Sequence, residues 1–434
     1  MRVSKTINID NNALFKYNLL AWAQQFEHIV WLDSNSSSNN IKHQQFDAIL
    51  AVDAYTVLKC DAKNAFQKLK EYQNTTSDYI FGYLGYDLKN DVEKLTSKNF
   101  DGLGFSDLTF FQPKKLFFIK GDTVEIKYLQ EFSDDIEEDF NDISNFDSDN
   151  KVIEKNNIKI KMRIHKDRYF EIIDNILSQI HRGNIYEVSF CQEFYAENST
   201  IDPLEVYNKL NDISAPPFAS FLKLDDTSLL SASPERFLKR TNNTIISQPI
   251  KGTTKRGTSS TEDEILKVNL VNDLKERAEN IMIVDLVRND LSRTAIKGSV
   301  SVPELCKVYS FKQVHQLIST VISTVKSTVN SVDIIKSMFP MGSMTGAPKI
   351  AAMKIIEELE ETKRGIYSGA VGYFSPNGNF DFSVVIRSIL YNQSKKYISY
   401  SVGGAITAKS IPEKEYEECL LKAKAMREVL LDSN

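Results

Sequence analysis

Two pairs of glutamates in the sequence have a spacing that suits a metal ion. Glu276 and Glu279 are three residues apart in KERAEN, and Glu415 and Glu418 are three residues apart in EKEYEE. On a helix, residues i and i+3 share a face, so each pair can direct both carboxylates to one point. If the two faces meet, their oxygens suit Mg²⁺, a hard cation that keeps waters and shares its shell with an anionic substrate. The alternative is that both pairs lie on solvated helix faces.

A lysine beside a glycine is the second candidate for chemistry. In QPIKGTTKRG (248–257), a predicted strand ends at Ile250, and Lys251 precedes Gly252 and Thr253, where the backbone can approach a ligand closely. A lysine in a partly dry pocket can act as a nucleophile when burial lowers its pKa. The alternative is an exposed turn lysine, which is the reading we give to Lys255.

Other residues allow two readings each. FPMGSMTGAPK (339–349) places two glycines before a predicted helix, where free N–H groups attract an anion, but it does not satisfy the P-loop pattern. Arg387, inside a predicted hydrophobic strand, suits a bidentate clamp on a carboxylate or a buried ion pair. His315 in VHQLIS is a core histidine or a site residue. Gly403 and Gly404, at a predicted strand end, form a bulge or allow a ligand to approach.

The elements that must position these residues alternate between helices and hairpins. Helical spacing from Tyr169 to Ile180 predicts a helix that ends at Gly183. Alternation predicts strands over 124–132, 229–234, 236–240 and 244–250, and a hairpin turning at 376–378. Strand runs separated by helices favour an α+β fold over a doubly wound parallel sheet.

Capping signals place the helices that carry the glutamates. Thr261 with Glu264 predicts a capping box for a helix through about residue 283, and Ser410 with Glu413 predicts another for the last helix. Pro348 suits the first turn of a helix that runs to Glu360.

The composition limits the class of protein. The 434 residues carry 53 basic and 58 acidic side chains, and the net charge of −5 does not suggest binding to nucleic acid or an anionic membrane. No apolar run approaches the ~20 residues of a membrane span, and the N-terminal residues lack the hydrophobic core of a secretory signal. The four cysteines are far apart, which indicates neither a disulfide framework nor a zinc site. We therefore expect a soluble, cytoplasmic protein.

Two polar stretches divide the chain. Residues 34–40 (SNSSSNN) predict a short loop. Residues 131–150 hold nine acids and no lysine or arginine, so they cannot bury enough surface to offset their ordering entropy. We predict an acidic linker or loop over 131–155, with an N-terminal subdomain over 1–130 and a catalytic domain over 156–434.

Several longer motifs place these residues in a known family. In order along the chain they are SPERF (233–237), PIKGT (249–253), KERAENIMIVDLVRND (275–290), HQLIS (315–319), GSMTGAPK (342–349), RGIYSGAVGYF (364–374), IRS (386–388) and PEKEYEECLLKA (412–423). From about residue 230 to 434 the chain closely resembles the chorismate-utilising enzymes. WLDS (31–34) and GYLGYD (82–87) extend the resemblance loosely toward the N-terminus. The resemblance implies a large α/β/β/α sandwich of the anthranilate synthase component I type, with two sheets packed orthogonally and the active site in the cleft.

The resemblance also implies a role for individual residues. Glu279 and Glu418 would hold Mg²⁺, with Glu276 and Glu415 acting more remotely. Lys251 would be the nucleophile, Glu235 the proton donor and His315 a supporting catalytic residue. The positions that match substrate contacts of the family are Gly252, Thr253, Tyr367, Arg387, Gly403, Gly404, Ala405 and Lys422.

Lys251 decides the branch of the family. It resembles the lysine of the aminodeoxychorismate synthases, where anthranilate synthases usually carry alanine. The expected reaction of component I of such a synthase replaces the C4 hydroxyl of chorismate with an amino group, giving 4-amino-4-deoxychorismate for p-aminobenzoate and folate synthesis. Isochorismate and salicylate synthases carry a catalytic lysine at the position of Glu187, so activation of water of that type is unsupported here.

The ammonia is expected from a separate glutamine amidotransferase subunit, because no cysteine lies on a tight glycine-flanked turn. Two alternatives stay open: anthranilate synthase component I, and a non-catalytic relative that binds chorismate or a partner. The chain also departs from the family at four positions, with Glu187 for glutamine, Ser189 for asparagine, Met341 for glycine and Ala405 for glycine.

Overall fold

The computed structural model describes residues 1–35, 43–146 and 158–431. The strands are β1 (Arg2–Asn8), β2 (His28–Asp33), β3 (Ala48–Cys60), β4 (Ile80–Leu84), β5 (Leu108–Lys120), β6 (Thr123–Leu129), β7 (Lys161–Met162), β8 (Glu187–Ala196), β9 (Phe218–Leu224), β10 (Thr227–Ser233), β11 (Arg236–Thr241), β12 (Thr244–Gln248), β13 (Ile250–Lys255), β14 (Ser301–Ser310), β15 (Val314–Thr324), β16 (Gly346–Ala347), β17 (Ala370–Phe374), β18 (Phe380–Val384), β19 (Ser388–Asn392) and β20 (Tyr397–Thr407).

The α-helices are α1 (Asn12–Trp22), α2 (Ala65–Thr76), α3 (Lys89–Val92), α4 (Ile136–Ser144), α5 (Lys166–His181), α6 (Pro203–Ser214), α7 (Ser260–Asn272), α8 (Leu274–Ser292), α9 (Ser331–Met338), α10 (Lys349–Leu359) and α11 (Pro412–Leu431). Short 3₁₀ helices are η1 (Ala23–Gln25), η2 (Tyr86–Leu88), η3 (Gln130–Asp135) and η4 (Gly342–Met344).

The strands pair antiparallel and form two sheets that share β5. One sheet runs through β1, β6, β5, β3, β2, β9, β10, β19, β20 and β8. The second sheet begins at the first half of β5, which pairs with β4, and continues through β17, β18, β11, β12 and β15. Both β13 and β14 pair with β15 at its end. Helices combined with antiparallel sheets confirm the predicted α+β class.

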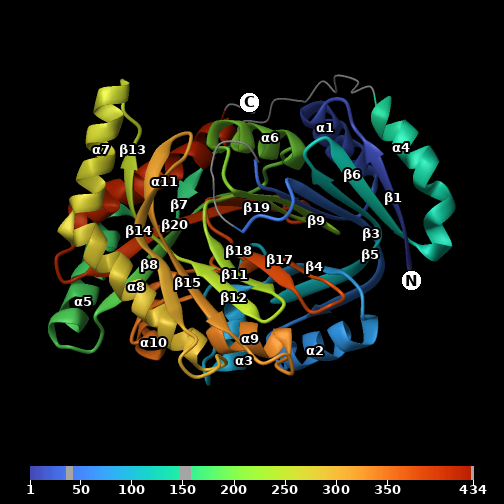
Figure 1. The fold of residues 1–434 in the computed structure, drawn as a ribbon. Helices are drawn as coiled ribbons and strands as arrows, with labels where there is room; N and C mark the ends of the chain where they lie inside the picture. The colour runs from blue at the N-terminus through green and yellow to red at the C-terminus, as the bar shows by residue number, and fades with distance from the viewer. Residues whose placement is uncertain (36–42, 147–157, 432–434) are drawn as a thin grey trace.

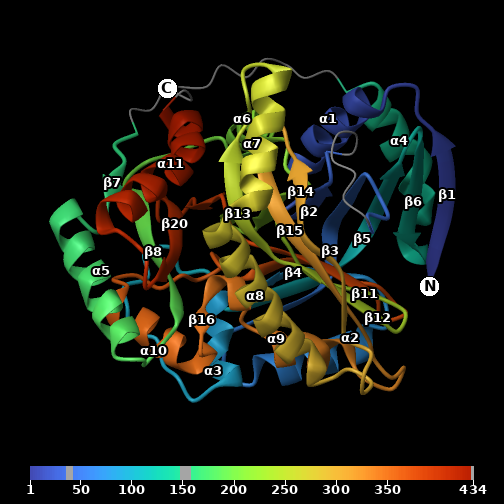
Figure 2. The same cartoon turned by 60° about the vertical axis from the view of Figure 1, so that its left-hand side comes forward.

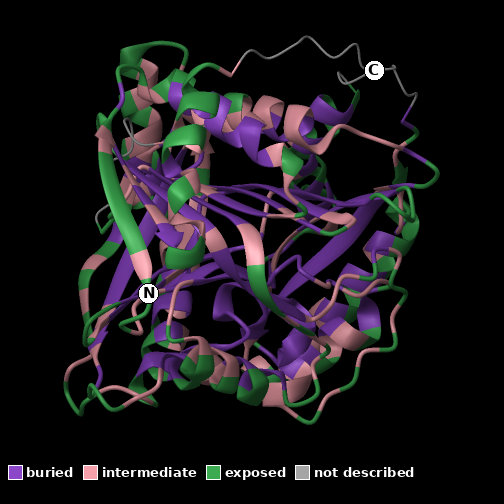
Figure 3. Ribbon diagram, turned by 90° about the vertical axis from the view of Figure 1, so that its right-hand side faces the viewer, coloured by how far each residue is buried: buried purple, intermediate pink, exposed green. Residues whose placement is uncertain are grey.

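Helices cover the outer faces of the sheets. Figures 1 and 2 show α1, α6 and α11 along one side of the strands and α2, α3 and α9 along the other. One apolar cluster packs α1, α6 and α11 on the first sheet, and a second fills the space between the sheets and beneath α2, α8 and α9. Figure 3 shows the resulting buried strands inside helices that have exposed outer faces. This layering fits the expected α/β/β/α sandwich.

Strand pairing crosses the boundary predicted after residue 130. β2 pairs with β9, and β4 pairs with β17, so the N-terminal residues contribute strands to both sheets.

The acidic stretch differs from the predicted linker. Its first part forms η3 and α4, and Ile136 and Ile143 are buried where α4 packs near α1. The side-chain amide of Asn18 on α1 donates to the carbonyl of Ile143 at 3.2 Å. Two isoleucines seven residues apart give this acidic helix an apolar side, which the charge count alone concealed. Residues 147–155 of the predicted linker, and 36–40 of the predicted loop, lie outside the described residues.

The helix predicted from residue 261 to 283 is two helices. Ser259, not Thr261, caps α7, and its hydroxyl accepts from the amide of Glu262 at 3.2 Å. Asp273 then leaves helical geometry, and its carboxylate accepts from the amides of Lys275 and Glu276 at 2.9 and 3.0 Å. Because aspartate is a strong N-cap residue, a new helix starts there, and Glu276 falls in the first turn of α8.

A buried arginine connects several of the segments that line the cleft. All five N–H donors of Arg364 have partners: its Nε and Nη2 donate to Glu360, Nη1 to Met344 O and Ser368 Oγ, and Nη2 also to Ser189 O. The carboxylate of Glu360 also accepts from the amide of Cys191 on β8 at 2.9 Å.

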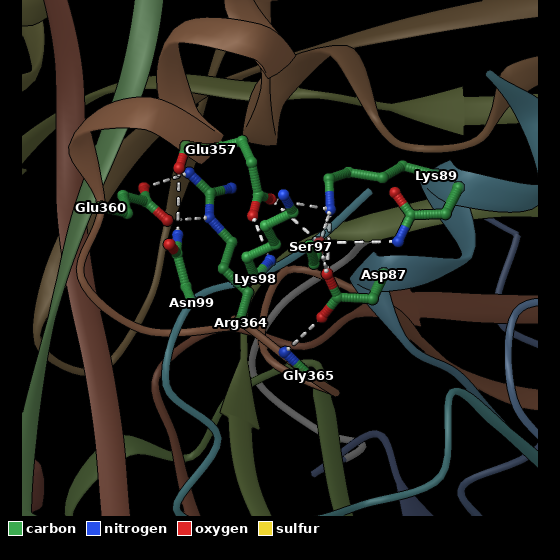
Figure 4. A network of polar contacts seen from close by, with 10 residues as sticks. Asp87, Lys89, Ser97, Lys98, Asn99, Glu357, Glu360, Arg364 and Gly365 are labelled. Carbon is green, nitrogen blue, oxygen red and sulfur yellow. Dashed lines mark hydrogen bonds and ion pairs between the residues drawn. The ribbon is translucent and has the colours of Figure 1, made fainter. Parts of the chain in front are cut away.

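The segment around Glu357 and Gly365 is in turn bound to the N-terminal part of the chain (Figure 4). The carboxylate of Asp87 accepts from the amide of Gly365 at 3.1 Å and from the fully buried ammonium of Lys89 at 2.9 Å. Ser97 donates to Glu357 on α10 at 2.9 Å. Residues 87–97 are therefore bound to the end of α10 through buried charges.

Removing the Arg364 guanidinium should destabilise the whole protein. Arg364→Met leaves the carboxylate of Glu360 buried and unpaired, and we expect the free energy of unfolding to fall by about 3–5 kcal/mol in denaturant titrations. Arg168→Met is the control, because Arg168 pairs with Glu171 on the surface and should contribute less than about 1 kcal/mol. Equal effects of the two substitutions would contradict the structural role of Arg364.

Candidate active site

Lys251 is one half of a largely buried ion pair. Its Nζ is 3.0 Å from Oε1 of Glu187, and the two side chains are 13% and 1% exposed. Lys251 is the second residue of β13, so the strand does not end at Ile250 as predicted. The amide of Asn280 on α8 donates to the carbonyls of Lys251 and Leu317 at 3.1 Å each and fixes the strand to the helix.

The charge state of Lys251 differs from the sequence-based expectation. Burial lowers the pKa of Lys251, but the carboxylates of Glu187, Glu279 and Glu235 outweigh it and raise the pKa above its usual range. The resting side chain is therefore an ammonium at neutral pH, and it must lose a proton before it can act as a nucleophile.

Gly252 makes room for the groups on either side of the strand. It has φ +95°, and a Cβ would lie 2.9 Å from Leu317 Cδ1 and 3.2 Å from Glu276 Oε2. The pairing of β13 with β15 also shifts register between Ile250 and Thr253. A glycine is required at this bulge because another residue would meet both backbone strain and a clash.

Glu235 is a buried carboxyl group near Lys251. It is 5% exposed, and the hydroxyl of Ser343 donates to its Oε1 at 2.8 Å. Burial raises the pKa of Glu235 to about 7, although Ser343, Lys251 and Arg387 act in the opposite direction. A carboxyl group with a pKa near the working pH is suited to general acid catalysis.

All four predicted glutamates interact with the ammonium group of one lysine, Lys275. Burial lowers the pKa of Lys275, but the carboxylates of Glu279, Glu415, Glu276 and Glu418 outweigh it and raise that pKa. α8 and α11 therefore bring both glutamate pairs near Lys275, the arrangement that the spacing allowed but did not require.

Within this set, burial raises the pKa values of Glu279, Glu276 and Glu415 above the usual range. Burial raises the pKa of Glu279 to about 7, opposed by Lys251 and Lys275 and reinforced by Glu276. Burial also raises the pKa of Glu276, with help from Glu418. For Glu418, the ammonium of Lys422 at 2.7 Å outweighs burial and lowers the pKa.

This donor set fits a hard divalent cation. An added positive charge would offset the burial that raises the pKa values of Glu276 and Glu279. Among the described residues, no three of the four carboxylates have ligand oxygens within 4.8 Å of one another. Waters and a substrate carboxylate would therefore complete the shell, which is usual for Mg²⁺.

Gly403 and Gly404 of β20 lie close to the carboxylates of Glu415 and Glu418 or to the neighbouring strand β8. A Cβ on Gly404 would lie 3.5 Å from Glu415 Oε2, 3.7 Å from Glu418 Oε1 and 3.8 Å from Lys422 Nζ. A Cβ on Gly403 would lie 2.0 Å from the carbonyl of Phe190 on β8. Both glycines are inside β20 and not at its end, and their missing side chains leave space next to the acidic residues.

The remaining predicted substrate contacts lie around this space. Arg387 has φ +51° between β18 and β19, so it is not inside a strand, and no described residue forms a hydrogen bond or ion pair with its guanidinium. Lys422 donates to the carbonyl of Gly403 at 2.8 Å. Thr253 is exposed on β13, and the hydroxyl of buried Tyr367 donates to Cys191 Sγ at 3.6 Å. Arg387 is thus available to a carboxylate ligand.

His315 is held away from the reacting groups. It is fully buried on β15, with Nε2 2.9 Å from Asp263 Oδ1 and Nδ1 2.8 Å from Ser310 Oγ. Among the described residues, these two side-chain contacts join His315 to α7 and β14, and neither Lys251 nor Glu235 contacts it. This arrangement agrees with the core reading that the sequence left open.

The other departures from the family pattern line the same cleft. Ser189 on β8 donates to the carbonyl of Ser343 at 3.0 Å, and Ala405 pairs with Ser189 across β20 and β8. Met341 is buried just before η4. Ser189 therefore helps to position the loop whose serine holds Glu235.

Sequence reasoning missed two residues of the site. Ser343 binds Glu235, and Lys275 lies among the four glutamates. Both stand inside motifs already singled out, GSMTGAPK and KERAEN. Neither side chain had a spacing signal, because each acts on residues that are distant in sequence.

Together these features form a candidate site for a small anionic ligand: a buried carboxyl group with a raised pKa, a lysine, an arginine whose guanidinium forms no hydrogen bond or ion pair with a described residue, and a set of carboxylates that could hold a cation. Residues 19–428 match the family of chorismate binding enzymes, and the chain belongs to that family. The resemblance seen in the sequence is confirmed.

Relatives within the family give the comparison more detail. A probable chloroplastic aminodeoxychorismate synthase of rice (Oryza sativa subsp. japonica) is 44% identical over 268 residues, which is 61% of this chain and 30% of that protein. Aminodeoxychorismate synthase component 1 of Escherichia coli is 42% identical over 253 residues, 58% of this chain and 55% of that protein. The matched stretch thus spans about half or less of these curated relatives.

A solved structure has the same fold over nearly the whole chain. Anthranilate synthase component I from Streptococcus pneumoniae superposes with a TM-score of 0.77 at 25% identity, covering 90% of this chain and 95% of that one. Among the described residues, no helix combines the length and the apolar character needed to cross a membrane.

The raised pKa of Glu235 predicts a loss of stability as the pH rises. Since the pKa rises from 4.5 to about 7 on folding, the stabilisation is complete below about pH 4.5 and is lost as the pH rises through about 7. In EDTA, we expect wild-type protein to lose about 2 kcal/mol more free energy of unfolding than Glu235→Gln between pH 5 and 8. Parallel profiles for the two proteins would show that Glu235 titrates near its ordinary value.

Proposed function

We propose that this chain replaces the C4 hydroxyl of chorismate with an amino group, the activity of component I of an aminodeoxychorismate synthase. One observation carries the proposal: Lys251 and Glu235 are buried near one another, with Arg387 beside Glu235, Glu279 facing Lys251 and the other three glutamates around Lys275. The names of the rice and Escherichia coli relatives support this reading.

Two residues divide the difficult substitution into two easier ones. Hydroxide is a poor leaving group, so Glu235 donates its proton to the C4 oxygen as the C–O bond breaks. The Nζ of Lys251 attacks C2 of the ring, the double bonds shift, and water leaves from C4. Ammonia then attacks C4, the C2–N bond breaks, and Glu235 recovers a proton from the new ammonium group.

The other residues bind and orient the substrate. Arg387 pairs with a carboxylate, and the open backbone at Gly404 admits the ring carboxylate beside Lys422. Mg²⁺, held by Glu279 and Glu418 with Glu276 and Glu415 behind them, would neutralise the charge of that carboxylate and fix its position.

The ammonia is expected from a glutamine amidotransferase outside this chain. A glutaminase cysteine must react as a thiolate, but burial raises the pKa of Cys60, Cys191, Cys306 and Cys419 alike. The designation component 1 of the Escherichia coli relative supports a second component. We propose a cytoplasmic complex of the two.

The product tests the proposed reaction. With chorismate, Mg²⁺ and ammonium, wild-type protein should form 4-amino-4-deoxychorismate, which yields p-aminobenzoate only after a lyase is added. Lys251→Ala should lower turnover by roughly 100-fold or more while chorismate affinity changes little, because the amine acts mainly in the transition state.

Two outcomes would contradict this reading. Anthranilate formed without a lyase would identify an anthranilate synthase, the activity named for the Streptococcus pneumoniae structure. Binding of chorismate with no turnover would identify a non-catalytic relative. Full aminodeoxychorismate formation by Lys251→Ala would remove the lysine from the mechanism and leave ammonia to displace the hydroxyl directly.

The metal proposal has its own test. Glu279→Gln and Glu418→Gln should each raise the half-saturating Mg²⁺ concentration by roughly tenfold or more, both in turnover and in calorimetric binding. Glu417→Gln is the matched control, since Glu417 is exposed on α11 beside Glu418. An unchanged Mg²⁺ requirement in both site variants would refute the assignment.

A further inference from the structure

One buried carboxylate in the cleft has no role in the mechanism above. Glu187 is the first residue of β8, where it pairs with Ala347 on β16 and Thr407 on β20. Its side chain is fully buried, with Oε1 3.0 Å from Lys251 Nζ. Its Oε2 is buried without a hydrogen-bond partner among the described residues. A carboxylate oxygen left in this state costs free energy, so it points to a function.

We propose that Glu187 accepts the proton of Lys251 and so converts the resting ammonium to the nucleophilic amine. The inference rests on the proposed function, because it gives the lysine attack a proton acceptor that the scheme otherwise lacks. It is specific to the carboxylate, since a glutamine at this position could hold the lysine but could not take a proton.

The other carboxylates facing Lys251 are committed elsewhere. Glu235, next to β11, must be protonated when the hydroxyl leaves, so it cannot also receive the lysine proton. Glu279 on α8 belongs to the proposed metal set, and Glu276 and Glu418 interact with Lys251 only from that set. Among the carboxylates of the described residues, Glu187 alone forms a hydrogen bond with Nζ and has no other role in the proposed mechanism.

The proton balance closes over one turnover. A proton moves from Lys251 Nζ to Glu187, leaving a neutral amine and a carboxylic acid. The amine attacks C2 and becomes a secondary ammonium, while Glu235 gives its proton to the departing hydroxyl. When ammonia attacks C4, Lys251 leaves C2 as a neutral amine, the new C4 ammonium returns a proton to Glu235, and Glu187 returns its proton to Lys251.

The test compares two pH profiles on full-length protein at fixed Mg²⁺. The first is the acetylation of Lys251 by a pulse of acetic anhydride without chorismate, measured by mass spectrometry, which reports when the free amine loses its proton. The second is the rate of adduct formation on the Lys251 peptide with chorismate and no ammonia. Proton transfer inside the pair does not change the number of bound protons, so it adds no pH dependence of its own to the second profile, which then follows only the protonation of Glu235 above about pH 7.

In wild-type protein we expect adduct formation to stay level below about pH 7, where Glu235 keeps its proton, although the acetylation midpoint of Lys251 lies far above that range. In Glu187→Gln the acetylation midpoint should fall by at least about one pH unit, because a buried ammonium loses its partner. Adduct formation in this variant should then decrease tenfold per pH unit as the pH falls below about 7. Glu187→Asp, which keeps a carboxylate, should keep the level profile at a reduced rate.

The matched control is Glu197→Gln, which removes a carboxylate from the exposed pair with Lys161 at 2.8 Å. It should leave both profiles as in wild type. Wild-type adduct formation that follows the acetylation midpoint, or an unshifted midpoint in Glu187→Gln, would overturn the role of Glu187. Absence of any adduct in wild type would instead overturn the lysine mechanism itself, and with it this inference.

Discussion

The guanidinium of Arg364 is the constraint on which the cleft depends. It is almost completely buried, and a charge in that position is tolerable only when all its donors have partners. Its partners lie on β8, on the loop at Met344 and at the end of α10, so satisfying one side chain fixes three separate segments. Those segments carry Glu187 and Ser343, which hold the lysine and the acid.

The same physical setting gives carboxylates different tasks. Glu235 and Glu187 are both buried near Lys251, yet one is hydrogen-bonded by a hydroxyl and the other by an ammonium. A hydroxyl partner leaves room for a proton on the acid, whereas an ammonium partner supplies one. In the proposed reaction, one hydrogen-bond partner therefore distinguishes the acid Glu235, bound by Ser343, from the base Glu187, bound by Lys251.

Much of the fold and of the candidate site could be predicted from the sequence. The class of fold and the hairpin at 376–378 follow from period and spacing, which are local signals. The spacing also groups the glutamates into two pairs, but only the fold places both pairs around Lys275. The break at Asp273 was missed because neither a glycine nor a proline marks it in the sequence. The helix α4 was missed because its acidic charge concealed two apolar residues.

The ion pair between Lys251 and Glu187 could not be predicted in the same way. The two residues are 64 positions apart, and no periodicity links them. Glu187 did stand out as a departure from its family, yet only the pairing of β8 with β16 and β20 places it against the lysine. The raised pKa of Lys251 follows from that meeting, and the sequence had suggested the opposite direction.

The pairing of strands that are far apart in the sequence also affects how the chain folds during its synthesis on the ribosome. β4 ends at Leu84, but its partner β17 begins at Ala370. The edge of β4 that pairs with β17 therefore stays unpaired while the residues between them are synthesised. At ordinary rates of synthesis that delay is on the order of tens of seconds. An apolar strand with an unpaired edge attracts other unfinished chains. The nascent protein should therefore depend on chaperones until β17 has emerged and paired with β4.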